Sequence, residues 1–337
     1  MPASVTIVVT QRERFSATLE SLESIYTHTD MPFKLVYVTA NAPRKIQRLL
    51  EQTSQDYGFS LVRHVSGYLT PNQARNLGFQ SVDADYCVFI DNDVLVQDGW
   101  LNALVNCAEE TGADIVGPTY LIGRPEKDIL HLTQGKAYFT EENGIRTFHE
   151  SHVHSGDHFS AVADTLKRQP SDFVEFHCML ARTSTLRQLG PFDDGLRTAA
   201  EHVDACMAVT SAGGTVYTEP ASVVAYVPAP HFLNIADLRF YLWRWSDPSN
   251  KTTLDRFRTK HRLREDDPFL AQHYHWLTAH RRRPLRWLNG GVRRLLGNRV
   301  ADTFCRITDG LLFALTPKQS SGAKIKKARR QCRPAFP

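Results

Sequence analysis

The feature that most constrains the fold is the stretch DYCVFIDNDV at positions 85–94. Residues 86–90 form a continuous β-branched, aromatic and apolar run, which is typical of a strand covered on both faces in a parallel sheet. Asp91 and Asp93 follow two residues apart, so both carboxylates point to one side if strand geometry continues. Two oxygen ligands at the carboxyl end of such a strand predict a Mg²⁺ or Mn²⁺ site. A turn that caps a helix starting near Asp98 is the alternative interpretation of the same spacing.

Strands and helices alternate on the N-terminal side of this stretch. The alternation predicts an α/β fold with a doubly wound, mostly parallel, Rossmann-like sheet whose carboxyl edge is open to a nucleotide. The expected strands are residues 5–10, 35–39 and 61–64, and the expected helices are residues 15–26 and those beginning at Arg44 and Pro71.

Residues 123–172 are polar, rich in histidine and weakly periodic, and we expect an active-site flap or irregular hairpins there. The histidines match no helical or zinc-finger spacing, so we expect surface loop residues rather than metal ligands. A strand is expected at 173–181, where His177 either lines the site or is a hydrogen-bonded core residue. The five histidines of the polar region are His131, His149, His152, His154 and His158.

Four motifs, taken in order, resemble those of family 2 glycosyltransferases, which are nucleotide-sugar transferases with the GT-A fold. They are the opening strand VTIVVT at 5–10, the helix NQARNLG at 72–78, the strand end FIDND at 89–93 and the acidic helix start EHVD at 201–204. The resemblance covers about residues 4–231. It implies a metal-dependent enzyme of the inverting type that moves a sugar from a nucleotide-sugar donor to an acceptor hydroxyl, although GT-A folds serve both stereochemical outcomes.

The resemblance also implies roles for single residues. Asp93 would bind Mn²⁺ or Mg²⁺ directly, and Asp91 would lie beside it, nearer the ribose or the donor sugar. The divalent ion would neutralise the charge that develops on the leaving diphosphate. Arg75 would contact the donor or, alternatively, form an ion pair with a core acid. The other implied donor contacts are Thr10, Gln11, Glu13, Thr39, Asn41, Asn72 and Asn76.

Two positions depart from the family pattern around the donor. The second strand ends in Thr39 and Asn41 where the family commonly has an acid that reads the nucleobase, so these two residues are the expected base contacts. Tyr226 occupies the slot of the family's metal-binding histidine. His231 follows five residues later and is the expected substitute as a metal ligand, with an ordinary loop histidine as the alternative.

A third departure concerns the catalytic base. His202 occupies the slot of the second acid of the family's acidic pair, and a histidine can take a proton from a hydroxyl near neutral pH. Glu201 or Asp204 can also serve, with His202 in an orienting role. We therefore assign the base to the set Glu201, His202 and Asp204, while noting that acids in a first helical turn often only complement the helix dipole.

Residues 1–231 are expected to form the GT-A domain, followed by a basic helical extension at 232–316 and a basic, disordered tail at 317–337. The extension sets leucines against arginines, a pattern compatible with an anionic membrane surface and also with helices packed on the catalytic domain. No apolar stretch is long enough to span a bilayer, and we expect a cytoplasmic protein, peripheral to the inner face of the membrane. The expected partners are a nucleotide-sugar donor and a glycan or lipid-linked acceptor, and no nucleic acid.

Other functions compete with this hypothesis. A nucleotidyltransferase shares the sheet and the metal carboxylates, but it needs a glycine-rich phosphate loop after the first strand, and QRER at 11–14 contains no glycine. The arginine-rich tail suggests a non-catalytic nucleic-acid-binding protein, but it matches no recognised module. An inactive, sugar-binding transferase also fits the sequence because of His202.

Overall fold

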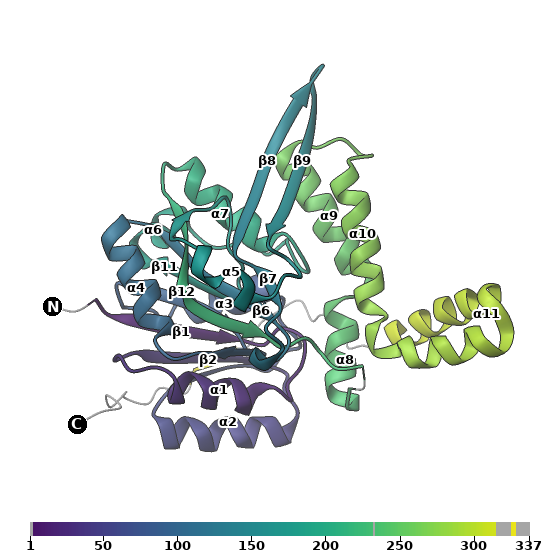
Figure 1. Cartoon of the computed structure of the whole chain (residues 1–337). Coiled ribbons are helices and arrows are strands. Elements are labelled where there is room, and N and C mark those ends of the chain that lie inside the picture. Colours follow the sequence, from purple (N-terminus) through teal and green to yellow (C-terminus); the bar gives the residue numbers. More distant parts are fainter. Residues whose placement is uncertain (1–2, 232, 315–324, 328–337) are drawn as a thin grey trace.

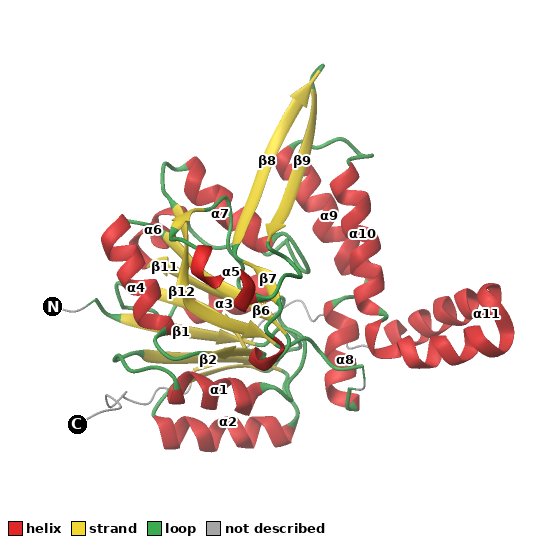
Figure 2. Ribbon diagram, in the orientation of Figure 1, coloured by secondary structure: helices red, strands yellow, loops and turns green. Residues whose placement is uncertain are grey.

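The computed structural model describes residues 3–231, 233–314 and 325–327. Figures 1 and 2 show a central sheet flanked by helices, from which one long hairpin projects beside a group of C-terminal helices. The strands are β1 (Val5–Thr10), β2 (Lys34–Ala40), β3 (Ser60–His64), β4 (Tyr86–Asp91), β5 (Val94–Val96), β6 (Ile115–Ile122), β7 (Leu130–Leu132), β8 (Gln134–Glu142), β9 (Ile145–Val153), β10 (Gln169–Pro170), β11 (Cys178–Arg182), β12 (Val216–Tyr226) and β13 (Ile325–Lys327). The α-helices are α1 (Thr18–Thr27), α2 (Arg44–Tyr57), α3 (Pro71–Phe79), α4 (Trp100–Thr111), α5 (Phe159–Val162), α6 (Thr183–Leu189), α7 (Glu201–Ser211), α8 (Ile235–Arg244), α9 (Asp247–His261), α10 (Pro268–Arg281) and α11 (Arg286–Ala314).

The sheet is mixed but mostly parallel in its N-terminal half. β3, β2, β1 and β4 lie side by side and parallel, so their carboxyl ends meet at one edge. β11 is inserted antiparallel between β4 and β6, and β6 pairs in parallel with β12. The full order is β10-β12-β6-β11-β4-β1-β2-β3-β13, with β5 added to β12 and β7 to β6. The predicted α/β fold is confirmed.

The two central strands, β1 and β4, are buried along their whole length, as their apolar runs predict. Helix α3 lies directly on this part of the sheet. A Cβ atom at Gly78 would lie 2.4 Å from Cγ1 of Val8 and 2.9 Å from Cγ2 of Val38, so only glycine allows this close packing. The packing holds the first turn of α3, with Asn72 and Arg75, at the carboxyl ends of the strands.

The polar region at 123–172 contains one regular hairpin instead of the irregular hairpins that we expected. β8 and β9 pair without interruption from Gln134 and Val153 to Glu142 and Ile145. Three histidines of this region lie on β7 and β9 and are therefore placed by strand geometry. The expectation of five surface loop residues is wrong for these partly buried side chains, which are His131, His149 and His152.

The base of this hairpin is clamped to the segment before β11. The Ser171 hydroxyl accepts a hydrogen bond from the Gly135 N–H at 3.0 Å, and a Cβ atom at Gly135 would lie 2.5 Å from the Phe173 carbonyl oxygen. Phe173 forms an isolated bridge with Gly135 of the hairpin, and regular pairing with the sheet starts only later, so the predicted strand at 173–181 is shorter than expected and β11 begins at Cys178.

The helices that follow residue 231 share the core of the sheet domain. The Asp237 carboxylate accepts a hydrogen bond from the Phe15 N–H at 2.6 Å, and Phe240 stacks on Phe15 at 4.8 Å. Tyr241 and Trp245 belong to the same hydrophobic cluster as β1 and β4. α8 to α10 thus complete the folded unit, whereas α11 extends away from it (Figure 1). Within the described ranges, no helix has the length and apolar character needed to cross a membrane.

Of the predicted tail at 317–337, the structure describes only β13, which pairs with β3. The remainder of that prediction lies outside the described residues.

Candidate active site

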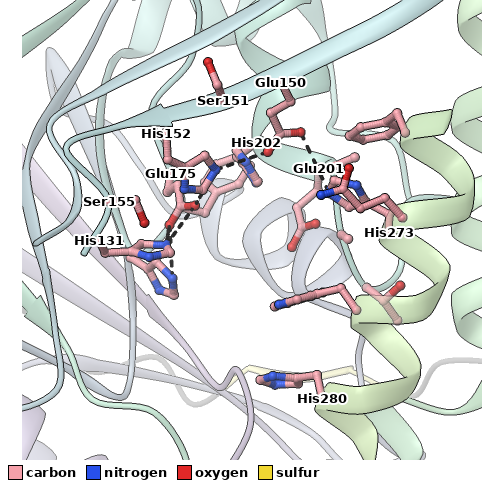
Figure 3. A pocket seen from close by; sticks show the side chains of 18 of the residues that line it. His131, Glu150, Ser151, His152, Ser155, Glu175, Glu201, His202, His273 and His280 are labelled. Atoms are coloured by element: carbon pink, nitrogen blue, oxygen red, sulfur yellow. Dashed lines mark hydrogen bonds and ion pairs between the residues drawn. The ribbon is translucent and has the colours of Figure 1, made fainter. Parts of the chain in front are cut away.

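A cavity of about 870 Å³ opens at the carboxyl ends of β1 and β4. The sheet edge contributes Arg12 and Asp91 to its lining, the hairpin and the segment before β11 contribute a group of histidines and glutamates, and α7 contributes the start of its first turn. Helix α10 closes the opposite side with His273 and His280 (Figure 3). The cavity therefore combines residues from the predicted catalytic domain and from the predicted extension.

Asp91 is the last residue of β4 and is held by three nitrogen groups. Its Oδ1 accepts a hydrogen bond from Arg75 at 3.2 Å, and its Oδ2 lies 3.5 Å from Nε of Arg12 and 3.3 Å from Nδ1 of His177. Burial raises the pKa of Asp91, but the hydrogen bond from His177 and the charges of Arg75 and Arg12 outweigh it and lower the pKa. Asp91 is therefore an ionised carboxylate.

Asp93 follows in the turn between β4 and β5 and is only 1% exposed. Neither of its carboxylate oxygens has a hydrogen-bond partner. Burial raises the pKa of Asp93 to about 8; the Arg12 charge opposes this rise, while the carboxylates of Glu13 and Asp91 add to it. Ligand atoms of Asp91, Asp93 and His177 all lie within 4.8 Å of one another. A divalent cation fits this donor set, because it would satisfy a buried carboxylate that is otherwise unpaired.

Arg75 is 1% exposed and connects the strand end to α7. Besides its bond to Asp91, its Nη1 lies 3.7 Å from the Glu201 carboxylate and donates to the Asn72 side chain at 3.2 Å. Its guanidinium lies 3.8 Å above the Phe176 ring. The two alternatives predicted for Arg75, a donor contact and an ion pair with a core acid, are therefore compatible. Arg75 forms the ion pairs and also lines the cavity.

The other two predicted contacts on α3 hold a loop. Asn72 donates to the Asp193 carbonyl at 3.0 Å, and Asn76 donates to the Phe192 carbonyl at 2.9 Å and to the Asp194 carboxylate at 2.9 Å. Neither asparagine is among the residues that line the cavity. Their direct interactions fix the segment that precedes α7.

Helix α7 presents Glu201 and His202 to the cavity. The Glu201 carboxylate lies between two guanidiniums, 3.5 Å from Arg244 and 3.7 Å from Arg75. Burial raises the pKa of Glu201, and these two cations lower it below its usual value. Nε2 of His202 is buried without a hydrogen-bond partner, and the ring packs against Phe173 at 5.3 Å.

Asp204, the third member of the predicted catalytic set, lies apart from the other two. Its carboxylate oxygens face α9, one 2.7 Å from Nζ of Lys260 and the other 3.1 Å from Nε2 of His261. It is not among the residues that line the cavity. In this structure Asp204 links α7 to α9.

The segment after β1 places a partly buried guanidinium and a buried carboxylate side by side. Glu13 accepts a hydrogen bond from His280 at 2.9 Å and lies 3.4 Å from the Arg12 guanidinium. The Arg12 guanidinium lies 4.4 Å above the Tyr226 ring, and Tyr226 stacks on His177 at 4.0 Å. Glu13, a predicted donor contact, therefore lies beside Arg12, and Arg12 in turn lies beside Asp91 of the metal group.

The predicted contacts at the ends of β1 and β2 lie near a smaller cavity; Thr10, Gln11 and Thr39 are buried, whereas Asn41 is exposed. Thr39 and Asn41 line this second cavity, of about 180 Å³. The Thr39 hydroxyl and the Gln11 side-chain nitrogen are buried without partners, although the Gln11 oxygen accepts a hydrogen bond from the Ala40 N–H at 3.1 Å. Thr10 pairs in register with Asp91. These residues surround the sheet edge next to the metal group.

His231 is exposed in the loop after β12 and does not join the metal group. His177 stands beside the two aspartates instead. Its sequence neighbourhood indicated only that it could line the site. Arg12 was missed altogether as a site residue, although a charged residue directly after a buried parallel strand is a signal that could have found it.

Comparison with known proteins agrees with this geometry. Residues 4–167 match the family model described as "Glycosyl transferase family 2". Curated relatives are the pre-mycofactocin glycosyltransferases of two Mycobacterium tuberculosis strains, CDC 1551 / Oshkosh and ATCC 25618 / H37Rv. Each is 28% identical over 156 residues, which is 46% of this chain and 30% of the relative, so the match spans less than a third of the relatives' length.

Among solved structures, the crystal structure of GalNAc-T7 with UDP, GalNAc and Mn²⁺ has a TM-score of 0.51 and 15% sequence identity. The match covers 82% of this chain and 56% of that chain. This likeness concerns the fold. The predicted fold class, and the family resemblance on which the predicted type of enzyme rests, are confirmed.

Proposed function

We propose that this chain, which belongs to glycosyl transferase family 2 through residues 4–167, moves a sugar from a nucleoside-diphosphate donor to an acceptor hydroxyl with the help of a divalent metal ion. The observation that carries the proposal is the buried, unpaired Asp93 carboxylate beside Asp91 and His177. The relatives agree with it: they are named glycosyltransferases, and the GalNAc-T7 crystal contains UDP and Mn²⁺.

Asp91, Asp93 and His177 are the residues that would hold the ion. When bound, Mn²⁺ or Mg²⁺ would act as a Lewis acid on the diphosphate leaving group. Arg75 and Arg12 keep Asp91 ionised before the donor arrives, and both carry N–H groups suited to phosphate oxygens. The protein thus supplies a set of buried cations and ligands that is arranged before the reaction begins.

The nucleobase is assigned to the smaller cavity. Thr39 has an unpaired buried hydroxyl there, and Asn41 contributes a side-chain amide at the end of β2. Because both groups can donate and accept hydrogen bonds, they can read the edge of a base without the acid that the family commonly uses. Gln11 adds a buried, unpaired N–H₂ group nearby.

Proton acceptance from the acceptor hydroxyl is assigned to His202. Glu201 is held between Arg75 and Arg244, and the lowered pKa that results makes it a weak base. His202 has a ring nitrogen that is not engaged by another residue, and it lines the same cavity. Glu201 then acts as a positioning residue for the start of α7. This arrangement supports direct displacement with inversion.

The acceptor is proposed to be a glycan. Aromatic side chains line the cavity, and one of them, Trp276, is 49% exposed. The flat faces of such rings pack well against the C–H groups of sugars, while the polar groups of the cavity take the hydroxyls. The aromatic residues of the lining include Tyr138, Phe148, Trp245, Phe269 and Trp276.

An anionic membrane surface is proposed as a partner of α11. Its exposed apolar side chains, Leu295, Leu296 and Ile307 among them, lie on the same projecting element as the exposed arginines Arg293 and Arg294. Exposed leucines beside arginines suit the boundary between lipid headgroups and acyl chains. Co-sedimentation with vesicles containing an anionic lipid should therefore exceed that with zwitterionic vesicles and should fall in Leu295→Ser/Leu296→Ser. Equal binding to both kinds of vesicle would exclude this partner.

The transferase proposal is tested with a panel of nucleotide sugars. Release of nucleoside diphosphate by the wild type is followed with Mn²⁺ and after treatment with EDTA. We expect release from one donor class that requires the metal, and we expect His202→Gln to release nucleoside diphosphate much more slowly than the wild type. If no donor in the panel is bound or turned over, the proposal fails. Full activity in EDTA would instead indicate that Arg12 and Arg75, and not a metal ion, neutralise the charge on the leaving diphosphate.

A further inference from the structure

We propose that His131, His152 and Glu175 form a second metal site, which binds an ion that favours nitrogen ligands, such as Zn²⁺, and is separate from the site at Asp91, Asp93 and His177. The proposal goes beyond the transferase function. It concerns the adjoining hairpin side of the cavity, where Glu175 lies 3.1 Å from His177, and it can be tested without a nucleotide sugar.

The ligand atoms have the spacing of a coordination shell. Nε2 of His131 lies 3.2 Å and 3.1 Å from the two carboxylate oxygens of Glu175, and Nε2 of His152 lies 3.9 Å from one of them. One ligand atom from each residue lies within 4.8 Å of the others. Atoms that each lie about 2.0–2.2 Å from a tetrahedral zinc ion are roughly 3.3–3.6 Å apart, so small adjustments of the side chains suffice.

The three residues come from separate segments that the fold locks together. His131 lies on β7, His152 on β9, and Glu175 in the loop before β11. The clamp between Gly135 and the segment Ser171–Phe173 holds the hairpin base against this loop, and Glu175 donates its backbone N–H to Tyr120 at 3.0 Å. The site is therefore built on rigid elements rather than on a free loop. Figure 3 shows His131, His152 and Glu175 gathered on one side of the cavity.

The metal-ligand atoms of each cluster indicate which ion that cluster prefers. Two imidazoles and one carboxylate suit Zn²⁺ and similar ions, whereas the two carboxylates and one imidazole of the Asp91 group suit Mn²⁺ or Mg²⁺. Three protein ligands leave a fourth position of a tetrahedral ion open. All three residues line the cavity, so this position is available to water or to an acceptor oxygen.

The competing interpretation is a hydrogen-bonded network without an ion. His152 lies 3.2 Å from the Glu150 carboxylate, and His177 lies 3.1 Å from Glu175, so neutral histidines can satisfy both acids by donating N–H bonds. In that case Glu175 takes its hydrogen bonds from His131 and His177. The two interpretations differ in a measurable way, because only the first provides high-affinity binding of a nitrogen-favouring ion.

The experiment measures metal binding to the full chain after treatment with a chelator. Calorimetric titration with Zn²⁺ and the absorption spectrum of the Co²⁺-substituted protein report the number and the nature of the ligands. We expect His131→Gln and His152→Gln each to weaken Zn²⁺ binding by about 100-fold or more, which exceeds the 10–100-fold expected for the loss of an outer-shell partner. Asp93→Asn should leave this binding in place while removing the Mn²⁺ site.

His154→Gln is the matched control, because His154 follows the same strand but pairs with Asp157 outside the cluster. Circular dichroism and the melting temperature show whether each variant is folded, and a rise in melting temperature on addition of Zn²⁺ gives a second readout of binding. The proposal is overturned if the wild type binds no Zn²⁺, if both histidine variants bind it like the wild type, or if Asp93→Asn abolishes Zn²⁺ and Mn²⁺ binding together. The last result would mean one shared site centred on His177.

Discussion

The two walls of the large cavity are built in different ways. The sheet-edge wall carries Asp91, Asp93 and Arg75 at the carboxyl ends of parallel strands, and its residues come from motifs that are short and continuous in the sequence. The hairpin wall carries His131, His152 and Glu175, which come from three segments joined only by tertiary contacts. Chemically comparable clusters can thus arise from a local pattern or from long-range packing, and sequence reasoning finds only the first kind.

The walls also differ in how their charges are balanced. On the sheet-edge wall, buried guanidiniums compensate Asp91, while Asp93 is left without any hydrogen-bond partner. On the hairpin wall, Glu175 is surrounded by histidines; burial raises its pKa, but the charges of His131 and His177 lower it well below its usual range. The unpaired Asp93 therefore makes the sheet-edge wall the one that depends most on a cation.

The largest effect is expected for Asp93→Asn. Loss of the carboxylate should lower the metal-dependent rate of nucleoside diphosphate release on the order of 10³-fold and weaken Mn²⁺ binding, because the leaving group loses its charge stabilisation. Steady-state kinetics and Mn²⁺ titration check this. The control is Asp98→Asn, five residues along the chain with a side chain that is 89% exposed, which should behave like the wild type. Equal losses in both variants would refute the role of Asp93.

Arg75→Lys should have the next largest effect. A lysine keeps the charge but cannot bridge Asp91 and Glu201 while stacking on Phe176, so we expect donor turnover to fall by about 10–100-fold. Arg258→Lys, in the partly exposed ion pair with Asp255, is the matched control and should change turnover little. Wild-type kinetics for Arg75→Lys would show that the planar guanidinium is not required at the sheet edge.

Two glycine substitutions test the walls separately. Gly78→Ala forces a Cβ atom to within 2.4 Å of Val8, and Gly135→Ala places one 2.5 Å from the Phe173 carbonyl, so each should reduce the free energy of unfolding by about 1–3 kcal/mol. Gly78→Ala should also lower donor turnover by displacing Arg75, and Gly135→Ala should weaken Zn²⁺ binding. Denaturant unfolding, kinetics and calorimetry measure these effects.

Gly291→Ala is the control for both substitutions, because nothing lies within 4 Å of its added Cβ atom. If Gly78→Ala and Gly135→Ala changed the same property, the division of the cavity into two independently built walls would be wrong.

The last prediction concerns the pH dependence of stability in the metal-free protein. The pKa of Asp93 is raised from 3.8 to about 8, so between these values the folded chain binds one more proton than the unfolded chain. The stability that this group contributes is complete below pH 4 and is lost as the pH rises toward 8, by up to about 1.4 kcal/mol per pH unit. Asp93→Asn should lack this slope. If the free energy of unfolding changed with pH in the same way for the wild type and Asp93→Asn across this range, the raised pKa would be contradicted.

Much of the sheet-edge wall was predictable from the sequence. The run that ends in Asp91, the helix with Arg75, and the helix start with Glu201 and His202 are each local patterns that place polar groups at the ends of buried elements. Asp204 shows the limit of such reasoning. It lies in the same acidic motif, but contact with Lys260 on α9, which no local pattern reveals, turns it away from the cavity lining.

By itself, the sequence determined the strand-helix alternation, the parallel central strands and the acids at their ends, because burial of apolar runs and the period of side chains along an element are local properties. Tertiary structure alone decided that His177 joins Asp91 and Asp93, that β7 and β9 bring His131 and His152 to Glu175, and that α10 closes the cavity with His280. These contacts join residues separated by 21 to 267 positions, and their geometry depends on how whole elements pack, which no local pattern encodes.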